Sequence, residues 1–266
     1  MSELGLVEPT HDDYVRLFEP LAAMQARHGE LSRVGPASRS QAAIDSRSKV
    51  GQMAWHLSLP AAAIGVDHLV AWANLRVRAG SQPPFSHFTL IRAAIEGCAV
   101  ARWLCDPAVT AAVRVQRAAG VQLEDYEQRL RFENRTGSGL VKPTGSGRTA
   151  AQRLAGLKKL LASHKVTALQ MPPTTVLFGR YAPFDDRPIG GEGLYRLMAG
   201  VIHSKVWSLQ AVTDLSDVVD LGEGSRPMKV EANEEFAFVA TLIAMRIALD
   251  ALADIERYAA PPKSSS

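Results

Sequence analysis

Apolar positions recur at helical spacing along almost the whole chain. In Asp12–His28 they fall three or four residues apart, which predicts a helix with Pro20 as a kink. The same pattern predicts further helices over Ser40–Leu59, Pro60–Arg78, Ser86–Cys105, Pro107–Arg135, Arg148–His164, a segment beginning at Leu194, and Glu231–Tyr258. We therefore expect an all-α fold, a bundle of about seven to eight helices.

Segments rich in glycine and proline separate the expected helices. Gly137–Gly147 is typical of a flexible loop, and Thr167–Gly193 of a long irregular connection. Val218–Leu221 and Met228–Val230 can pair as one short β-hairpin near residues 206–230, or that stretch is simply a loop. We expect a single all-α domain over residues 1–260 and a disordered tail at 261–266.

The composition indicates a soluble protein. Apolar residues make up 47% of the 266 positions, the net charge is +3, and no run of about 18 apolar residues predicts a membrane span. The N-terminus lacks the basic and apolar pattern of a secretory signal. Cys98 and Cys105 fall about 10 Å apart on one expected helix, too far for a disulfide. We expect a reduced, cytoplasmic chain.

Positive charge is concentrated in the middle of the chain. Residues 134–184 contain no acidic residue, and their bases are Arg135, Lys142, Arg148, Arg153, Lys158, Lys159, Lys165 and Arg180. Such a segment can attract phosphate groups, or it can form solvated helix faces that pair with acidic groups elsewhere. The candidates for RNA or phosphate binding are Arg148, Arg153, Lys158 and Lys159.

The segment Tyr195–His203 places an arginine and a histidine in an apolar, helix-favouring run. Arg196 and His203 are seven positions apart, about two helical turns, so both fall on one face of one helix. Burying either side chain without a partner is unfavourable. We therefore expect the pair to have either a structural or a catalytic role.

Two other expected helices carry polar residues among apolar ones. Arg92 and Glu96 are four positions apart and can pair, while Asp67 and His68 interrupt another apolar stretch. With Arg196 and His203 they predict a buried polar network between three helices. Such a network can fix the packing of helices, or it can form an active site.

Other chemistries have little support in the sequence. No histidine or cysteine spacing predicts a metal site on one helix, although a site assembled from His56, His68, Glu96 and His203 stays an alternative. No phosphate-binding loop or nucleophile elbow is present, and we expect no cofactor. The tryptophans lie in apolar context and are expected in the core; they are Trp55, Trp72, Trp103 and Trp207.

The segments Asp67–Leu69, Leu90–Glu96, Trp103–Pro107 and Tyr195–His203 together resemble an uncharacterised group of helical bacterial proteins common in actinobacteria. That group is similar to HEPN-type domains, which carry an arginine, four to six residues, and then a histidine near the start of a late helix. The resemblance covers about half of the chain, from Asp67 to His203. It implies an HEPN-like helical bundle.

The resemblance also implies a function. In active HEPN ribonucleases two chains dimerise and form a metal-independent site, in which His203 would transfer protons and Arg196 would stabilise phosphate charge. Active members usually place a polar residue directly after the arginine, where this chain has Leu197. Many relatives are non-catalytic helical modules.

Two hypotheses follow. The first is a non-catalytic HEPN-like domain that acts through an unknown protein partner or as a homodimer, in a stress- or defence-related setting. The alternative is an HEPN-type ribonuclease, with RNA as its partner and Arg196 and His203 at a site in the dimer interface.

Overall fold

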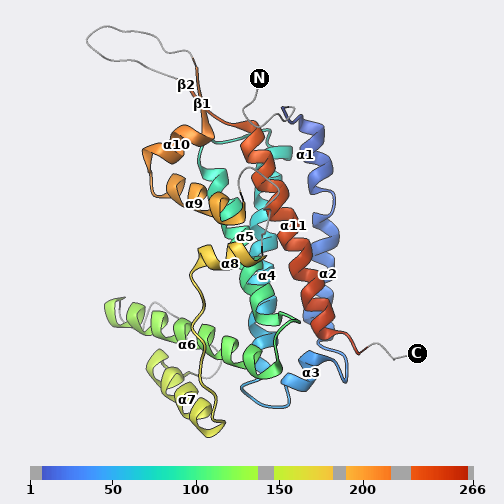
Figure 1. Ribbon diagram of the computed structural model, residues 1–266, viewed down its shortest axis with the longest axis vertical. Helices are drawn as coiled ribbons and strands as arrows, with labels where there is room; N and C mark the ends of the chain where they lie inside the picture. The colour runs from blue at the N-terminus through green and yellow to red at the C-terminus, as the bar shows by residue number, and fades with distance from the viewer. Residues whose placement is uncertain (1–7, 137–146, 182–189, 217–228, 263–266) are drawn as a thin grey trace. The chain divides into compact units, whose positions relative to one another are not determined.

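The computed structural model describes residues 8–136, 147–181, 190–216 and 229–262. These residues are almost entirely helical, and two short strands form one antiparallel pair (Figure 1). The all-α prediction is therefore confirmed. Several expected helices are divided into shorter ones, so the described residues hold more helices than we predicted.

The chain divides into two compact units, each built from three segments. Unit 1 comprises Met1–Arg33, Pro60–Arg102 and Pro173–Ala253. Unit 2 comprises Val34–Leu59, Trp103–Pro172 and Asp254–Ser266. The single domain expected over residues 1–260 stays a prediction.

The first expected helix is two helices, because Pro20 ends the first rather than bending it. In α1 (His11–Phe18) the side chain of Thr10 accepts a hydrogen bond from the backbone of Asp13, whose carboxylate bonds back to Thr10. This capping box satisfies backbone N–H groups that the first turn leaves free. After Glu19 and Pro20 the chain enters α2 (Leu21–Val34).

The expected boundary at Pro60 was wrong. A short helix α3 (Gln41–Asp45), capped by Ser40, is followed by α4 (Gln52–Ala73), which runs through Pro60. The chain instead leaves the helical conformation between these two helices, before Gln52. A π-helical turn, η1 (Asn74–Arg78), follows α4 directly.

The helix α5 (Ser86–Cys105) has the bounds that the sequence predicts. Glycines on both helices allow α4 and α5 to approach closely within unit 1. A Cβ atom added to Gly65 of α4 would lie 2.4 Å from the sulfur of Cys98 on α5. One added to Gly97 of α5 would lie 2.6 Å from the carbonyl oxygen of Ala61 on α4. Cys98 is buried, which raises the pKa of its thiol to about 12. It therefore acts as a small core residue.

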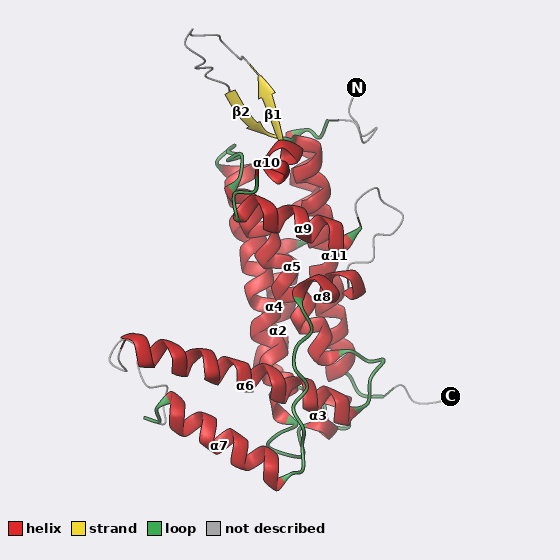
Figure 2. Ribbon diagram, turned by 60° about the vertical axis from the view of Figure 1, so that its left-hand side comes forward, coloured by secondary structure: helices red, strands yellow, loops and turns green. Residues whose placement is uncertain are grey.

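Unit 2 contains the helices α6 (Ala111–Thr136) and α7 (Ala150–Ser163), which lie side by side (Figure 2). The core between them is formed by Val50, Ala119, Leu157 and Leu161. A capping box of Thr149 and Gln152 starts α7. The flexible loop expected at Gly137–Gly147 lies almost entirely outside the described residues, as does Lys142.

The expected irregular segment Thr167–Gly193 contains a helix that we did not predict, α8 (Thr174–Tyr181). Leu177, Phe178 and Tyr181 are its buried residues. The helix α9 (Gly191–Ile202) follows, and α8 and α9 pack against each other. A turn at His203–Lys205 then leads into α10 (Val206–Val212).

The strands form a hairpin between α10 and the last helix. Strand β1 (Thr213–Ser216) pairs antiparallel with β2 (Lys229–Ala232), with Thr213 opposite Ala232 (Figure 2). The hairpin confirms the sheet alternative, but β1 precedes the strand expected at Val218–Leu221, which lies outside the described residues. Most of the expected tail, from Lys263 on, lies there as well.

Among the described helices, α11 (Glu234–Ala259) is long and apolar enough to cross a membrane. Of its most apolar window, 61% is buried inside the structure. The core helix of a soluble protein can be as long and as apolar as α11, so α11 is weak support for a membrane span. The absence of a membrane partner stays a prediction.

Candidate functional site

Arg92 and Glu96 form the part of the expected polar network that the structure assembles. The Arg92 Nε atom donates a hydrogen bond to Glu96 Oε1 at 2.8 Å, along one face of α5. The side chains are largely but not fully buried, with exposed fractions of 18% and 35%. Both ions therefore keep contact with water, which reduces the unfavourable desolvation of the pair.

Tyr195 on α9 is a member of this cluster that the sequence analysis missed. Arg92 Nη2 donates to the Tyr195 hydroxyl oxygen at 2.8 Å, and the guanidinium carbon lies 4.8 Å from the centre of the ring. The ring of Phe178 packs against the ring of Tyr195, with the two ring centres 4.6 Å apart. The sequence pattern indicates Arg196 but not its neighbour Tyr195, which lies on the side of α9 that approaches α5.

Arg196 and His203 lie on the exposed side of α9. The buried side of the helix consists of Leu194, Leu197, Met198 and Val201. Arg196 is 65% exposed and donates to Glu192, one turn earlier on the same helix, at 2.9 Å from Nε and 2.8 Å from Nη2. His203 is exposed and ends the helix as its C-cap. Neither residue belongs to a buried network, and that expectation was wrong for both.

Asp67 and His68 are not joined to the cluster. Asp67 is exposed and His68 half-buried on α4. Within the described ranges, no hydrogen bond or ion pair connects either residue to Arg92, Glu96, Arg196 or His203. The six residues that we expected to meet thus divide into one bonded pair, Arg92 and Glu96, and four side chains that contribute nothing to it.

The candidate phosphate-binding residues belong to unit 2, whereas Arg196 and His203 belong to unit 1. Arg148 precedes α7, and Lys158 and Lys159 are exposed on it. Lys158 lies 3.8 Å from Glu127 of α6. Arg153 Nε donates to the carbonyl oxygen of Arg148 at 3.3 Å.

The N-terminus of α7 already holds an anion from the chain itself. Glu133 accepts hydrogen bonds from Arg129 Nε at 2.8 Å and from the backbone N–H of Ala150 at 3.0 Å. These bonds keep the pKa of the Glu133 carboxyl below its usual value. A phosphate at this helix end would have to compete with Glu133, so the N-terminus of α7 does not support the predicted phosphate binding.

An exposed apolar surface adjoins His203. Ile202, Val206 and Trp207 lie at the turn between α9 and α10, and the two residues of α10 are 67% and 57% exposed. We call these three residues the α9–α10 apolar surface. The sequence predicts Trp207 in the core, but the side chain is exposed and lies against Gly200, where an added Cβ atom would approach its ring to 3.1 Å.

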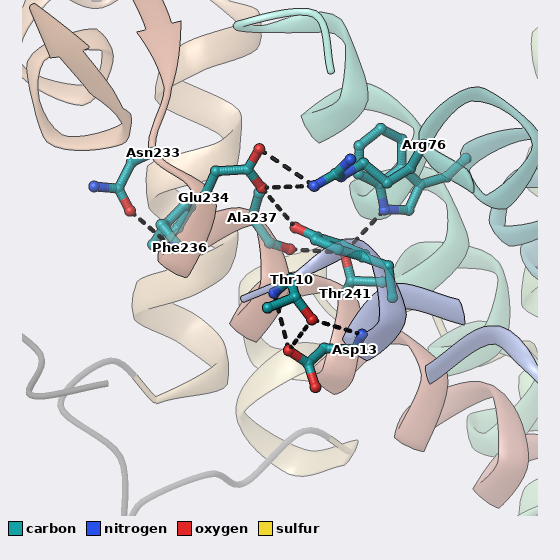
Figure 3. Close-up of polar contacts among 10 residues, drawn as sticks. Thr10, Asp13, Arg76, Asn233, Glu234, Phe236, Ala237 and Thr241 are labelled. Atoms are coloured by element: carbon teal, nitrogen blue, oxygen red, sulfur yellow. Dashed lines mark hydrogen bonds and ion pairs between the residues drawn. The ribbon is translucent and has the colours of Figure 1, made fainter. Parts of the chain in front are cut away.

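A second polar cluster in unit 1 joins residues of α1, η1 and α11 (Figure 3). Arg76 Nη2 lies 3.3 Å from Glu234 Oε2, which also accepts from the Tyr14 hydroxyl at 3.4 Å. The Arg76 guanidinium carbon lies 4.3 Å from the centre of the Tyr14 ring. Nearby, Trp72 donates to Thr241 at 2.9 Å. Burial raises the pKa of Tyr14, so its hydroxyl keeps the hydrogen that it donates to Glu234.

No cluster of three metal-binding side chains occurs in the part of the chain that the structure describes. No family model, curated protein or solved structure matches the chain. The resemblance to HEPN-type domains, and the homodimer, RNA and cytoplasmic setting expected with it, stay predictions.

Proposed function

We propose that this protein is a non-catalytic helical domain that acts by binding a partner, and that its partner is a second copy of the chain. The α9–α10 apolar surface carries the proposal. Exposed tryptophan is uncommon, and tryptophan and arginine are the residues that most often dominate the binding energy of protein interfaces. Here Trp207 is accompanied by two exposed aliphatic side chains on adjoining turns.

The order of charges along α9 supports a second copy as the occupant. Glu192 is exposed in the first turn, while His203 and Lys205 are exposed just after the last. Two α9 helices placed antiparallel about a two-fold axis would bring Glu192 of each copy to the basic end of the other. The apolar surface of each copy, which follows the C-terminal end of α9, would then lie near the N-terminal end of α9 in the other copy, beside the complementary charges.

The bonding of Arg196 favours the non-catalytic form of this proposal. Its guanidinium points one turn back along α9 to Glu192, away from His203. A phosphate would have to displace the Glu192 carboxylate before Arg196 could bind it. Leu197 is buried and offers no polar group beside Arg196.

Molar mass measured by light scattering over a range of protein concentrations tests the proposal. We expect a dimer that dissociates on dilution, and we expect Trp207→Ala to raise the dissociation constant at least about thirtyfold, as removal of an interface hot spot does. Val206→Glu places a charge in the α9–α10 apolar surface and should weaken the dimer. The matched control is Val176→Glu, which places a charge on a 55% exposed valine of α8 and should leave the dimer intact. A chain that stays monomeric at every concentration would show the homodimer to be wrong.

The second candidate function is an HEPN-type ribonuclease that needs no metal. The exposure of both Arg196 and His203 favours it, because both side chains can meet RNA or a second copy. Cleavage of single-stranded RNA in the presence of EDTA, abolished in His203→Ala and in Arg196→Ala, would establish this function. Cleavage that persists in both variants, or that is absent from the wild-type protein, would exclude it.

A further inference from the structure

Four buried polar atoms in one short segment of unit 1 have no hydrogen-bond partner in the structure. They are Arg76 Nε, His87 Nε2, and both the nitrogen and the oxygen of the Gln82 amide. Buried polar atoms in proteins are almost always hydrogen-bonded to protein, ordered water or a ligand. Their concentration between η1 and the start of α5 indicates that something other than these side chains completes the bonding.

The chemistry of His87 defines what its partner must supply. The ring is completely buried, and its Nδ1 lies 2.6 Å from the carbonyl oxygen of Pro83. A carbonyl only accepts, so Nδ1 carries the hydrogen of this bond. Burial lowers the pKa of His87 to about 4, so the ring is neutral near pH 7. Its Nε2 is then a bare acceptor that needs a donor.

The surroundings hold the His87 ring in place. The ring stacks on Trp72 with centroids 5.1 Å apart, and the ring of Phe88 lies 3.8 Å away on centroids. Trp72 is itself fixed by its hydrogen bond to Thr241. Because the ring is held by packing and by Pro83, its Nε2 atom is presented in one defined orientation.

The unpartnered atoms of Gln82 and Arg76 include the donors that a bare acceptor lacks. Gln82 directly precedes Pro83, and its amide offers two N–H donors and one oxygen acceptor. Arg76 uses Nη2 to bond Glu234, which leaves its Nε–H as a further donor. Arg76 belongs to η1, and π-helical turns frequently occur at functional sites.

We propose that Gln82 and His87 form a binding site for a hydroxyl group, with Arg76 as a supporting donor. The ligand O–H donates to His87 Nε2, and its oxygen accepts from the Gln82 amide. Water and a small alcohol share this chemistry. A metal ion fits less well, because the described residues place no further metal-binding side chains in a group there. This site is independent of the proposed dimer.

A crystal structure of the full chain at a resolution that shows ordered waters is the first test. We expect an oxygen atom within about 2.6–3.2 Å of His87 Nε2. An isolated oxygen identifies water; larger density, with a stoichiometric small molecule released on denaturation and detected by mass spectrometry, identifies an alcohol. A His87 Nε2 atom that contacts only carbon, or that accepts from a protein donor, would overturn the proposal.

Thermal unfolding of Gln82→Met is the second test. Methionine keeps the length of the side chain but cannot bond the ligand. We expect its melting temperature to fall by about 2–4 °C, the shift for one lost hydrogen bond in a chain of this size. The control Gln25→Met, on an exposed position of α2, should not change it. A higher melting temperature in Gln82→Met would show that the amide is truly unpartnered, and the site would be refuted.

Discussion

Asp45, Arg114 and Tyr258 form a buried charged cluster in unit 2. Arg114 Nε and the Tyr258 hydroxyl each donate to Asp45 Oδ2 at 2.8 Å, and the Asp45 side chain is fully buried. Arg114 also donates to the carbonyl oxygen of Asp106. Gln41 Nε2 donates to the other carboxylate oxygen, Asp45 Oδ1, at 2.6 Å. Both oxygens of this buried carboxylate are therefore bonded, which is a condition for tolerating a buried ion pair.

Removing Asp45 should therefore destabilise the protein strongly. In Asp45→Ala the Arg114 guanidinium stays buried without its counter-ion, and we expect the free energy of unfolding to fall by about 3–5 kcal/mol. Tyr258→Phe removes one hydrogen bond and should lower it by about 1 kcal/mol. Urea unfolding followed by circular dichroism measures both. A loss below 1 kcal/mol in Asp45→Ala would contradict a structural role for the cluster.

His87 should make stability depend on pH. Its folded pKa of about 4 lies below the usual value of 6.5, so between these values the unfolded chain binds more protons. Stability from His87 is therefore complete above about pH 6.5 and is lost as the pH falls to 4, a difference of about 3 kcal/mol. Between pH 7 and pH 4, the free energy of unfolding of the wild-type protein should fall by about 3 kcal/mol more than that of His87→Gln. The control is His56→Gln, at an exposed position, whose free energy of unfolding should change as that of the wild type does. Equal losses in wild type and His87→Gln would contradict this assignment.

Individual site residues were only partly predictable from the sequence. The four-residue spacing of Arg92 and Glu96 predicts their ion pair, because side chains four apart on a helix are neighbours. The exposure of Arg196 and His203 was missed, because an apolar run does not reveal which side of a helix faces water when other helices decide it. Burial of Arg114 was missed for the same reason: its partner Asp45 is far away in sequence.

At the scale of elements, the contact of α4 with α5 depends on glycine. Gly65→Ala would place a methyl group 2.4 Å from the Cys98 sulfur and 2.8 Å from the carbonyl oxygen of Ala94. The backbone of α5 cannot yield as a flexible side chain would, so we expect a loss of about 1–3 kcal/mol in the free energy of unfolding. The matched control is Gly29→Ala in α2, where nothing lies within 4 Å of the added atom. Gly29→Ala should raise the free energy of unfolding by about 0.5–1 kcal/mol. A Gly65→Ala protein as stable as Gly29→Ala would refute the close contact between α4 and α5.

Helix boundaries were predictable where local signals and packing agree. Ser86–Cys105 lies between a proline-rich turn and Asp106-Pro107, and α5 has those bounds. The boundary predicted at Pro60 was wrong, because Pro60 lies inside α4. A proline inside a helix removes one hydrogen bond, and the packing of the other residues of α4 outweighs that loss. The short helix α8 was missed because its eight residues follow two prolines and show less than three turns of periodicity.

At the scale of the whole molecule, neither compact unit is a continuous piece of chain. The longest segment of unit 2, residues 103–172, contains α6 and α7, but their core includes Val50, and the partners of Arg114 are Asp45 and Tyr258. This segment alone would leave a buried arginine without its anion and expose part of an apolar core. No local pattern in residues 103–172 reveals this dependence on distant segments.

We therefore expect the isolated fragment 103–172 not to fold. Its circular dichroism should show weak helicity that melts gradually, because two helices without their core neighbours are marginally stable in water. Adding a peptide of residues 34–59 should not restore the structure, since Tyr258 and the last turn of α11 are still missing. The full-length chain, purified in the same way, is the control and should unfold in a cooperative transition. A cooperative thermal transition in the fragment would mean that α6 and α7 form a self-sufficient hairpin, and that the cluster of Asp45, Arg114 and Tyr258 is dispensable for folding of this part of the chain.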